Sequence, residues 1–203
     1  MDERLLQKDI LVFDVGNVLV RFDPKIIAKG FFKPEKAKQL FSGVFESGLW
    51  SLIDTGLLHT GALARMMCEA AHTDDPEDYL TVSNLLDNFC EHECALKMSE
   101  QIPALKAMGK KLYYLSNYST PAFERTKARF SSFFSLFDGG VVSAHEHICK
   151  PAPRIFQILC ERYGFQPEDA LFIDDTLSNI EAAQREGFAV WHYTDGLHEA
   201  VDD

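Results

Sequence analysis

The sequence predicts an α/β protein, built as a doubly wound parallel sheet with a helical insertion after the first strand. Short apolar runs of strand length recur along the chain and are separated by segments with helical periodicity. Such alternation is typical of a mostly parallel sheet that is covered by helices on both faces. With 203 residues and 46% hydrophobic content, the chain is long enough to bury one such core.

Five apolar runs are the expected strands of this sheet. Most of their residues are aliphatic or aromatic, as is typical of strands that are buried on both faces. Because helical segments separate the runs, we expect neighbouring strands to lie parallel. The runs are ILVFDV (10–15), KLYYLSN (111–117), GVVSA (140–144), ALFIDD (170–175) and FAVWHY (188–193).

Helices are expected between these strands, because apolar residues recur there at helical spacing. Pro stands near the start of several of these segments and Gly just past the end, which is the usual asymmetry of helix boundaries. The segments are SEQIPALKAMG (99–109), PAFERTKARF (121–130), PAPRIFQILCERYG (151–164) and LSNIEAAQREG (177–187).

Residues 21–95 break the alternation, since this stretch has helical patterns but no expected strand. We therefore expect two units. An α/β core is formed by residues 1–20 and 96–203, and a helical cap is formed by residues 21–95.

Within the expected cap, two segments have clear helical spacing: PEKAKQLFSGVF (34–45) and TGALARMMCEAA (60–71). Thr60 is the expected N-cap of the second. We interpret the large apolar side chains of this region as its own packing core rather than as ligand contacts. They include Phe22, Phe45, Trp50 and Leu52.

The composition argues against several classes of partner. Lys and Arg number 20 against 31 Asp and Glu, a formal net charge of −11, and no basic stripe suits nucleic acid. No apolar run approaches the roughly 20 residues of a membrane-spanning helix. The charged start MDERLLQKD argues against a signal peptide, so we expect a cytoplasmic protein. The oligomeric state is left open.

The five cysteines are expected to be free thiols, because their number is odd and no secretion signal is expected. The run CEHEC (90–94) places two of them one helical turn apart. It has no second ligand pair at the spacing of a zinc site, so we expect no zinc there.

Polar residues gather where the expected strands end. Parallel strands of an open sheet point their carboxyl ends at one edge, where ligands bind. We therefore expect these residues to form one site. They are Asp14, Gly16 and Asn17 after the first strand, Ser116 and Asn117 after the second, Lys150 beyond the third, and Asp174 and Asp175 after the fourth.

The position of Asp14 in an apolar run needs a compensating charge, because burying an unpaired carboxylate is costly. A divalent cation and the ammonium of Lys150 beside it would keep it ionised. Mg²⁺ prefers carboxylate, phosphate and water oxygens, and Asp174 and Asp175 can complete such a set with Asp14.

The neighbouring residues suit an anionic ligand. Gly16 allows the chain to turn sharply with its backbone exposed, and Asn17 tolerates unusual dihedral angles. Ser116 and Asn117 offer hydroxyl and amide groups to the oxygens of an anion. Each of these residues alone is a common turn or cap residue, but together, at four strand ends, they indicate a functional site.

These four motifs resemble the haloacid dehalogenase-like hydrolase superfamily with a type-1 helical cap. FDVGNVLV matches its first motif, with the nucleophilic Asp after a hydrophobic strand, and YYLSN, CKPAPRIF and LFIDDTLSNIEAA match the second, third and fourth. The motifs occur in family order over nearly the whole chain. RFDP and GLWSLIDTGLL are similar to the bacterial branch that contains a glucose-1-phosphate phosphatase. The resemblance implies a Rossmann-like core and a phosphatase acting on a small phosphorylated metabolite, such as a sugar phosphate.

The resemblance also implies a role for each matching residue. Asp14 would form an aspartyl-phosphate that water hydrolyses, with Ser116 and Lys150 as the other catalytic residues. The implied cofactor is Mg²⁺, and its implied ligands are Asp14, the carbonyl of Gly16, Asp174 and Asp175. The implied substrate-binding residues are Gly16, Asn17, Ser116, Asn117 and Lys150.

One position departs from the family pattern. Most phosphatases of this superfamily carry a second Asp two residues after the nucleophile, as general acid and base, and here that residue is Gly16. General acid–base help is worth about 10² to 10⁴ in rate. Three explanations are open: a substrate with a good leaving group such as a sugar 1-phosphate, which we favour; a replacement by Asp23, Asp54 or His59; or weak catalysis.

Two alternative functions follow from the same residues. The first is carbon–halogen hydrolysis by Asp14, although dehalogenases of this superfamily usually carry an aromatic residue where this chain has Gly16. The second is a catalytically weak phosphate-binding or regulatory module that keeps the anion site without the acid.

Overall fold

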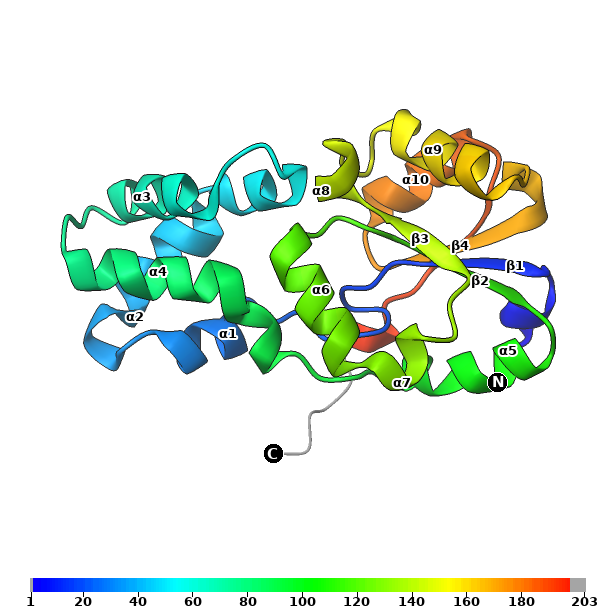
Figure 1. Ribbon diagram of the computed structural model, residues 1–203, viewed down its shortest axis with the longest axis horizontal. Coiled ribbons are helices and arrows are strands. Elements are labelled where there is room, and N and C mark those ends of the chain that lie inside the picture. Colours follow the sequence, from blue (N-terminus) through cyan, green and yellow to red (C-terminus); the bar gives the residue numbers. More distant parts are fainter. Residues whose placement is uncertain (1, 198–203) are drawn as a thin grey trace.

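The core of the molecule is one five-stranded parallel sheet in the order β3-β2-β1-β4-β5 (Figure 1). The computed structural model describes residues 2–197. Four strands lie within the predicted runs and β3 begins one residue before its run, at Gly139, so the predicted α/β class with a parallel sheet is confirmed. They are β1 (Ile10–Phe13), β2 (Lys111–Ser116), β3 (Gly139–Val142), β4 (Ala170–Asp174) and β5 (Ala189–His192).

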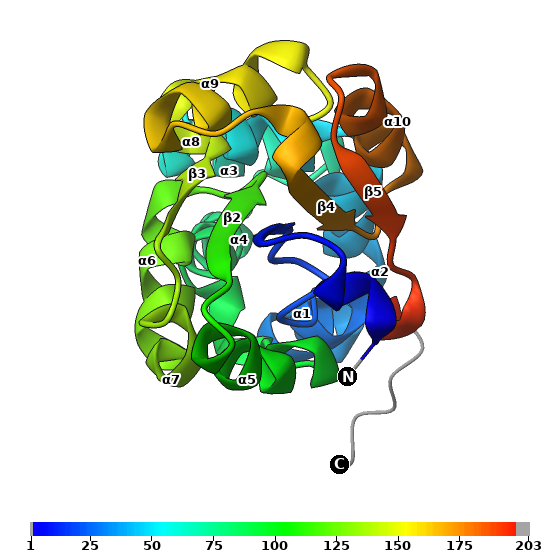
Figure 2. The same ribbon diagram turned by 90° about the vertical axis from the view of Figure 1, so that its right-hand side faces the viewer.

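Helices cover both faces of the sheet, as Figure 2 shows in a view onto the end of the core. Alternate strand residues point to opposite faces, and each face has its own apolar cluster. Phe13 and Tyr114 pack on the side of α5, α6 and α7, whereas Val12 and Phe172 pack on the side of α9 and α10. The helices of the core are α5 (Ile102–Ala107), α6 (Thr120–Arg129), α7 (Ser131–Phe134), α8 (Ser143–Glu146), α9 (Pro153–Tyr163) and α10 (Leu177–Arg185).

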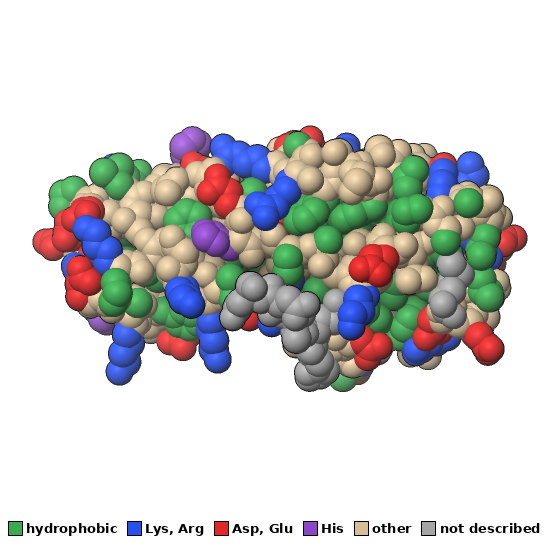
Figure 3. Space-filling model, turned by 90° about the horizontal axis from the view of Figure 1, so that it is seen from below, with side chains coloured by type: hydrophobic (Ala, Val, Ile, Leu, Met, Phe, Trp, Pro, Cys, Tyr) green, Lys and Arg blue, Asp and Glu red, His purple; other side chains and the backbone are tan. Residues whose placement is uncertain are grey.

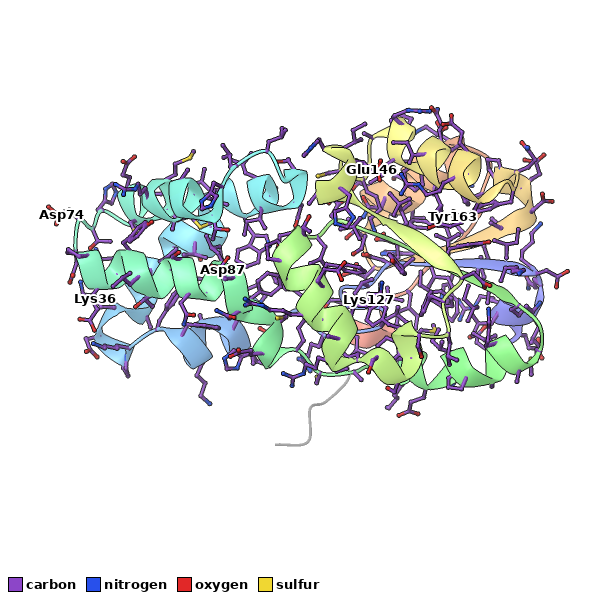
Figure 4. All side chains as sticks on the ribbon, viewed as in Figure 1. Lys36, Asp74, Asp87, Lys127, Glu146 and Tyr163 are labelled. Carbon is purple, nitrogen blue, oxygen red and sulfur yellow. The ribbon has the colours of Figure 1, made fainter. Side chains whose placement is uncertain are left out.

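Short 3₁₀ turns complete the core at helix and strand boundaries. They span Glu3–Leu6, Lys97–Gln101, Pro167–Asp169 and Asp195–Leu197. Tyr163, labelled in Figure 4, ties α9 to the sheet: its hydroxyl accepts a hydrogen bond from the Gly140 N–H at 2.7 Å and donates one to the Gly140 carbonyl at 3.0 Å.

The order of the strands reverses beside β1. The chain passes from β1 to β2 and β3 on one side, and then crosses to β4 and β5 on the other. The carboxyl ends of β1 and β4 therefore flank the crevice where open α/β sheets bind their ligands.

A helical lobe lies beside the sheet, at the left of Figure 1. Pro at the first turn of α1, α2 and α4 and acidic N-caps at Asp23 and Asp75 explain where these helices begin. Its elements are α1 (Pro24–Phe31), α2 (Pro34–Phe41), a π-helical turn (Ser42–Glu46), a 3₁₀ helix (Leu49–Thr55), α3 (Thr60–Ala70), α4 (Pro76–Asn88) and a 3₁₀ turn (Phe89–His92).

Polar contacts join the helices within this lobe. The ammonium of Lys36 on α2 lies 2.8 Å from the Asp78 carboxylate on α4, and Figure 4 labels Lys36 at the far end of the lobe. The expectation that Thr60 caps α3 was wrong. The cap is His59, whose Nδ1 accepts the Gly61 N–H at 3.2 Å, and Thr60 is the first helical residue.

The two chain segments that join the lobe to the sheet run side by side. The Arg21 N–H donates to the Cys94 carbonyl at 2.8 Å, and the Leu96 N–H donates to the Leu19 carbonyl at 2.9 Å. The lobe thus leaves and rejoins the core at one place.

The surface is mixed in charge, and acidic and basic side chains are interspersed over the face shown in Figure 3. Among residues 2–197, none of the helices combines the length and the apolar character that crossing a membrane requires.

Candidate active site

Side chains from three strand ends and from one loop meet at the crevice between β1 and β4. Asp14 directly follows β1, Ser116 and Asp174 are the last residues of β2 and β4, and Lys150 lies in the loop between α8 and α9. Hydrogen bonding fixes this edge: the Asp14 N–H donates to the Ile173 carbonyl at 2.8 Å, which continues the β1–β4 ladder by one residue.

Lys150 bridges two of the carboxylates. Its Nζ lies 2.9 Å from Asp14 Oδ1 and 2.6 Å from Asp174 Oδ2, and its side chain is only 1% exposed. Burial opposes the charged form of Lys150, but Asp14 and Asp174 together hold its pKa above the ordinary value. The ammonium is therefore a fixed positive charge at the floor of the site.

The two oxygens of Asp14 have different surroundings. Oδ1 accepts the Val15 N–H at 2.7 Å and the Ser116 hydroxyl at 2.9 Å, besides its contact with Lys150. Oδ2 accepts no hydrogen bond from the part of the chain that the structure describes. Three donors thus hold the carboxylate in one orientation and leave its second oxygen available to a ligand.

Burial raises the pKa of Asp14 to about 7; Lys150 opposes that shift, and the charges of Asp174 and Asp175 reinforce it. A bound cation acts in the opposite sense, since it favours the ionised carboxylate.

Asp174 is fully buried and is held by the start of α10, the helix that follows β4. The side-chain amide of Asn179 lies 3.1 Å from both of its oxygens, and the Thr176 N–H donates to Oδ1 at 2.8 Å. Asn179 was not among the site residues predicted from the sequence. The sequence signal that could have identified Asn179 is its position: it lies five residues after Asp174, on the first turn of the helix that follows the strand.

Asn17 links the loop after β1 to the loop after β4. Its side-chain amide group donates to Asp175 Oδ2 at 3.2 Å, and its side-chain oxygen Oδ1 accepts the Phe22 N–H at 3.0 Å. Its φ of 54° confirms the expectation of unusual dihedral angles at this position. Burial and the charge of Asp174 raise the pKa of Asp175 above its ordinary value.

Asn117 holds the backbone of Lys150. Its amide donates to the Lys150 carbonyl at 2.9 Å, and its side-chain oxygen accepts the Lys150 N–H at 2.7 Å. Because the side chain is used in this pair of bonds, a contact with an anion falls to the Asn117 backbone. The structure shows Asn117 as the residue that positions Lys150, a function not expected from the sequence.

The donor set fits a divalent cation. Asp14, Asp174 and Asp175 each offer a carboxylate oxygen, and these oxygens lie within 4.8 Å of one another. Three carboxylates against one ammonium leave two negative charges in this crevice, which one divalent ion would balance. Hard carboxylate ligands at this spacing suit Mg²⁺.

A pocket of about 220 Å³ opens above these residues. Its lining comes from the sheet edge and from the helical lobe: Asp14, Gly16, Asn17, Phe22, Trp50, Asp54, Phe89, Ser116, Asn117, Tyr118, Asp175 and Thr176. The interpretation of Phe22 and Trp50 as packing residues alone was therefore incomplete. Phe45 stacks on Trp50 with ring centroids 4.8 Å apart and does not itself line the pocket.

The three candidates for a replacement acid lie in different places. Asp54 lines the pocket. The Asp23 carboxylate caps α1 by accepting the N–H groups of Lys25 and Ile26. His59 caps α3 and lines a separate cavity of about 410 Å³.

Comparison with known proteins agrees with this geometry. The family model described as haloacid dehalogenase-like hydrolase matches residues 8–187. The chain belongs to this hydrolase family. The match covers β1 to β4 and the helical lobe, and so includes all the residues that line the pocket.

Two curated relatives resemble this hydrolase. Acyl-CoA dehydrogenase family member 10 of Mus musculus is 30% identical over 85% of the chain, which spans only 17% of that protein's length. The sesquiterpene phosphatase astK of Aspergillus oryzae is 24% identical over 94% of the chain and 92% of its own length.

A solved structure has the same fold. It is a HAD family enzyme from Bacteroides thetaiotaomicron in complex with magnesium and inorganic phosphate, with a TM-score of 0.65 and 18% identity. The similarity covers 90% of this hydrolase and 92% of that chain.

Proposed function

We propose that this hydrolase is a phosphatase that cleaves a small phosphorylated metabolite, with a sugar phosphate as the expected class. The observation that carries the proposal is the Asp14 carboxylate, which lines the pocket and is oriented by three donors on Oδ1, while Oδ2 accepts no hydrogen bond from the described residues. A fixed anionic nucleophile beside a buried ammonium is suited to phosphoryl transfer, which needs positioning and charge stabilisation.

In the proposed reaction, Asp14 Oδ2 attacks phosphorus and the bond to the leaving group breaks, which gives an aspartyl-phosphate. Water then attacks the same phosphorus and releases phosphate and the free carboxylate. Lys150 balances negative charge on Asp14 and on the transferred group. The backbone of Gly16, Asn17 and Asn117 binds the phosphoryl oxygens, and the Ser116 hydroxyl joins them by turning its proton from Asp14 Oδ1 to the bound substrate.

We propose Mg²⁺ as the cofactor, with Asp14, the Gly16 carbonyl, Asp174 and Asp175 as the residues that hold it. When bound, it supplies Lewis-acid stabilisation of charge on the phosphoryl oxygens. The donor set described above supports this assignment, as does the Bacteroides enzyme of the same fold, which was crystallised with magnesium and inorganic phosphate.

We propose that residues 21–95 act as a cap over this site. Phe22, Trp50, Asp54 and Phe89 reach the pocket from this segment, so it would contact the part of the substrate beyond the phosphate. A pocket of about 220 Å³ is smaller than the roughly 300–1,000 Å³ of sites for drug-sized ligands, which favours a small substrate.

The test is phosphate release from a panel of phosphomonoesters with Mg²⁺, compared between the wild type, Asp14→Asn and Asp74→Asn. Asp74 is an exposed acid at the far end of the lobe in Figure 4 and serves as the matched control. We expect Asp14→Asn to lose activity and Asp74→Asn to keep it. Halide release from 2-haloacids in chelator, or phosphate binding without turnover of any ester, would contradict the proposal.

A further inference from the structure

The proposed reaction needs a proton donor and a proton acceptor that the loop after β1 does not supply. The leaving oxygen must be protonated, and the attacking water must lose a proton. Gly16 has no side chain for either task. The lysine of the site cannot accept a proton while it remains an ammonium between Asp14 and Asp174.

Asp54 is an acid of the pocket whose carboxylate accepts no hydrogen bond from the described residues. It lies near the end of the 3₁₀ helix Leu49–Thr55 and lines the pocket together with Asp14. Its carboxylate makes no hydrogen bond or ion pair within residues 2–197. By contrast, the carboxylates of Asp14 and Asp175 are both engaged by neighbouring donors.

The backbone around Asp54 is fastened to the core. The Ser143 hydroxyl donates to the Asp54 carbonyl at 2.5 Å, and Nδ1 of His147 lies 2.9 Å from the Thr55 carbonyl. Gly56 follows at φ 63°, where a Cβ would lie 2.5 Å from the Ala144 carbonyl oxygen. The 3₁₀ helix thus lies against α8, as Figure 1 shows, and Asp54 is fixed relative to Asp14 although it belongs to the lobe.

The surroundings of Asp54 favour its neutral form. Burial raises the pKa of Asp54 to about 7, and the nearby ammonium of Lys150 limits the rise. The other titratable groups around the pocket are Asp14, Asp175 and Tyr118. An acid that titrates near neutrality can both donate and accept a proton under the same conditions.

We propose that Asp54 is the general acid and general base of the reaction, supplied by the lobe in place of a side chain at position 16. This inference rests on the proposed phosphatase function. In the first half, the P–O bond to the leaving group breaks and the Asp54 proton moves to the departing oxygen. In the second half, the Asp54 carboxylate takes a proton from water as the new P–O bond forms and the bond to Asp14 breaks.

The other candidates are already occupied. Asp23 caps α1 through Oδ1, which accepts the Lys25 N–H at 2.8 Å, and His59 caps α3 through Nδ1, which accepts the Gly61 N–H at 3.2 Å. Neither residue lines the pocket of Asp14. The structure therefore distinguishes Asp54 from two residues that the sequence could not separate from it.

The test compares Asp54→Asn with the wild type on two substrates. An alkyl phosphate needs a proton at its leaving oxygen, whereas p-nitrophenyl phosphate has a leaving group that departs as a stable anion. We expect a loss of about 10² to 10⁴ in kcat on the alkyl ester. On p-nitrophenyl phosphate we expect a burst of nitrophenol followed by slow turnover, because the aspartyl-phosphate forms but is hydrolysed slowly.

Further variants keep the result interpretable. Asp54→Glu retains a carboxyl group and is expected to restore the wild-type ratio between the two substrates, and Asp74→Asn should match the wild type throughout. Equal losses on both substrates without a burst, or the same altered ratio in Asp54→Glu as in Asp54→Asn, would overturn the assignment. A wild type that hydrolyses no phosphoester would instead refute the proposed function itself.

Discussion

Lys150 is the residue on which the charge balance of the site depends. It is the cation within contact of both Asp14 and Asp174, and all three side chains are almost fully removed from water. Removing one partner of a buried ion pair costs more than an exposed pair contributes, because the remaining charge stays buried without compensation.

The substitution Lys150→Met tests this at the residue scale. We expect the free energy of unfolding to fall by about 3–5 kcal/mol, since two buried carboxylates lose their shared cation. Urea denaturation at neutral pH measures the change. Lys38→Met, at an exposed position, is the control and should stay within about 0.5 kcal/mol of the wild type. Equal stability of the two variants would show that Lys150 does not stabilise the native state.

At the scale of elements, Glu93 joins three segments. It lies where the lobe returns to the core, and its carboxylate accepts hydrogen bonds from the hydroxyl groups of Tyr118, after β2, and Thr126, on α6. Only 2% of Glu93 is exposed. Burial raises the pKa of this carboxyl group to about 7, against the opposing effect of the two hydrogen bonds.

This buried acid predicts a pH-dependent stability. In the unfolded chain Glu93 loses its proton above about pH 4.5, whereas in the native state it keeps the proton until about pH 7. The contribution of Glu93 to the free energy of unfolding is therefore complete below pH 4.5 and is lost as the pH rises to 7. This loss is about 3 kcal/mol. We expect the stability difference between the wild type and Glu93→Gln to fall by this amount between pH 4.5 and 8 in urea denaturation. A difference that does not change with pH would contradict the assignment.

The apolar cluster between the sheet and helices α9 and α10 predicts that a cavity made in β4 strongly lowers the stability of the fold. Phe172 is fully buried, and its ring packs against Phe156 at 5.4 Å and Phe188 at 6.3 Å between centroids. We expect Phe172→Ala to lower the free energy of unfolding by about 3–5 kcal/mol. Leu80→Ala, at a residue that is 65% exposed, should change it much less. Thermal and urea unfolding of both variants compare the two positions.

At the scale of the whole molecule, the sequence predicted the sheet because each strand is encoded by a local apolar run, from ILVFDV to FAVWHY. It also predicted that Asp14, Ser116, Lys150 and the Asp174–Asp175 pair would meet, because parallel strands bring their carboxyl ends to one edge. The contacts that hold these site residues in place, and the residues that reach the pocket from the lobe, were not predictable in this way. Asn117 and Asp54 depend on how two distant segments approach one another, and no local pattern encodes that distance.

Because three carboxylates converge at one place, we expect Mg²⁺ to stabilise the native state of the whole molecule. An ion that binds only the native state stabilises it by about 2.7 kcal/mol at 100 times its dissociation constant. We therefore expect Mg²⁺ to raise the Tm of the wild type and chelator to reverse the rise, with little response in Asp175→Asn. Asp74→Asn should respond like the wild type. A Tm that is independent of Mg²⁺ in the wild type would argue against a metal at this site.

The paired backbone at residues 19–21 and 94–96 has a consequence for how this hydrolase can change. Because the two connections are hydrogen bonded to each other, the intervening chain can be lengthened, shortened or exchanged as a cassette while Asp14 and Ser116 stay where the sheet places them. The nucleophile and the carboxylate cluster then stay with the sheet, while the substrate contacts and the proposed acid travel with the lobe. We expect a graft of another lobe at this junction to redirect the hydrolase to a new ester, provided that the graft brings its own acid.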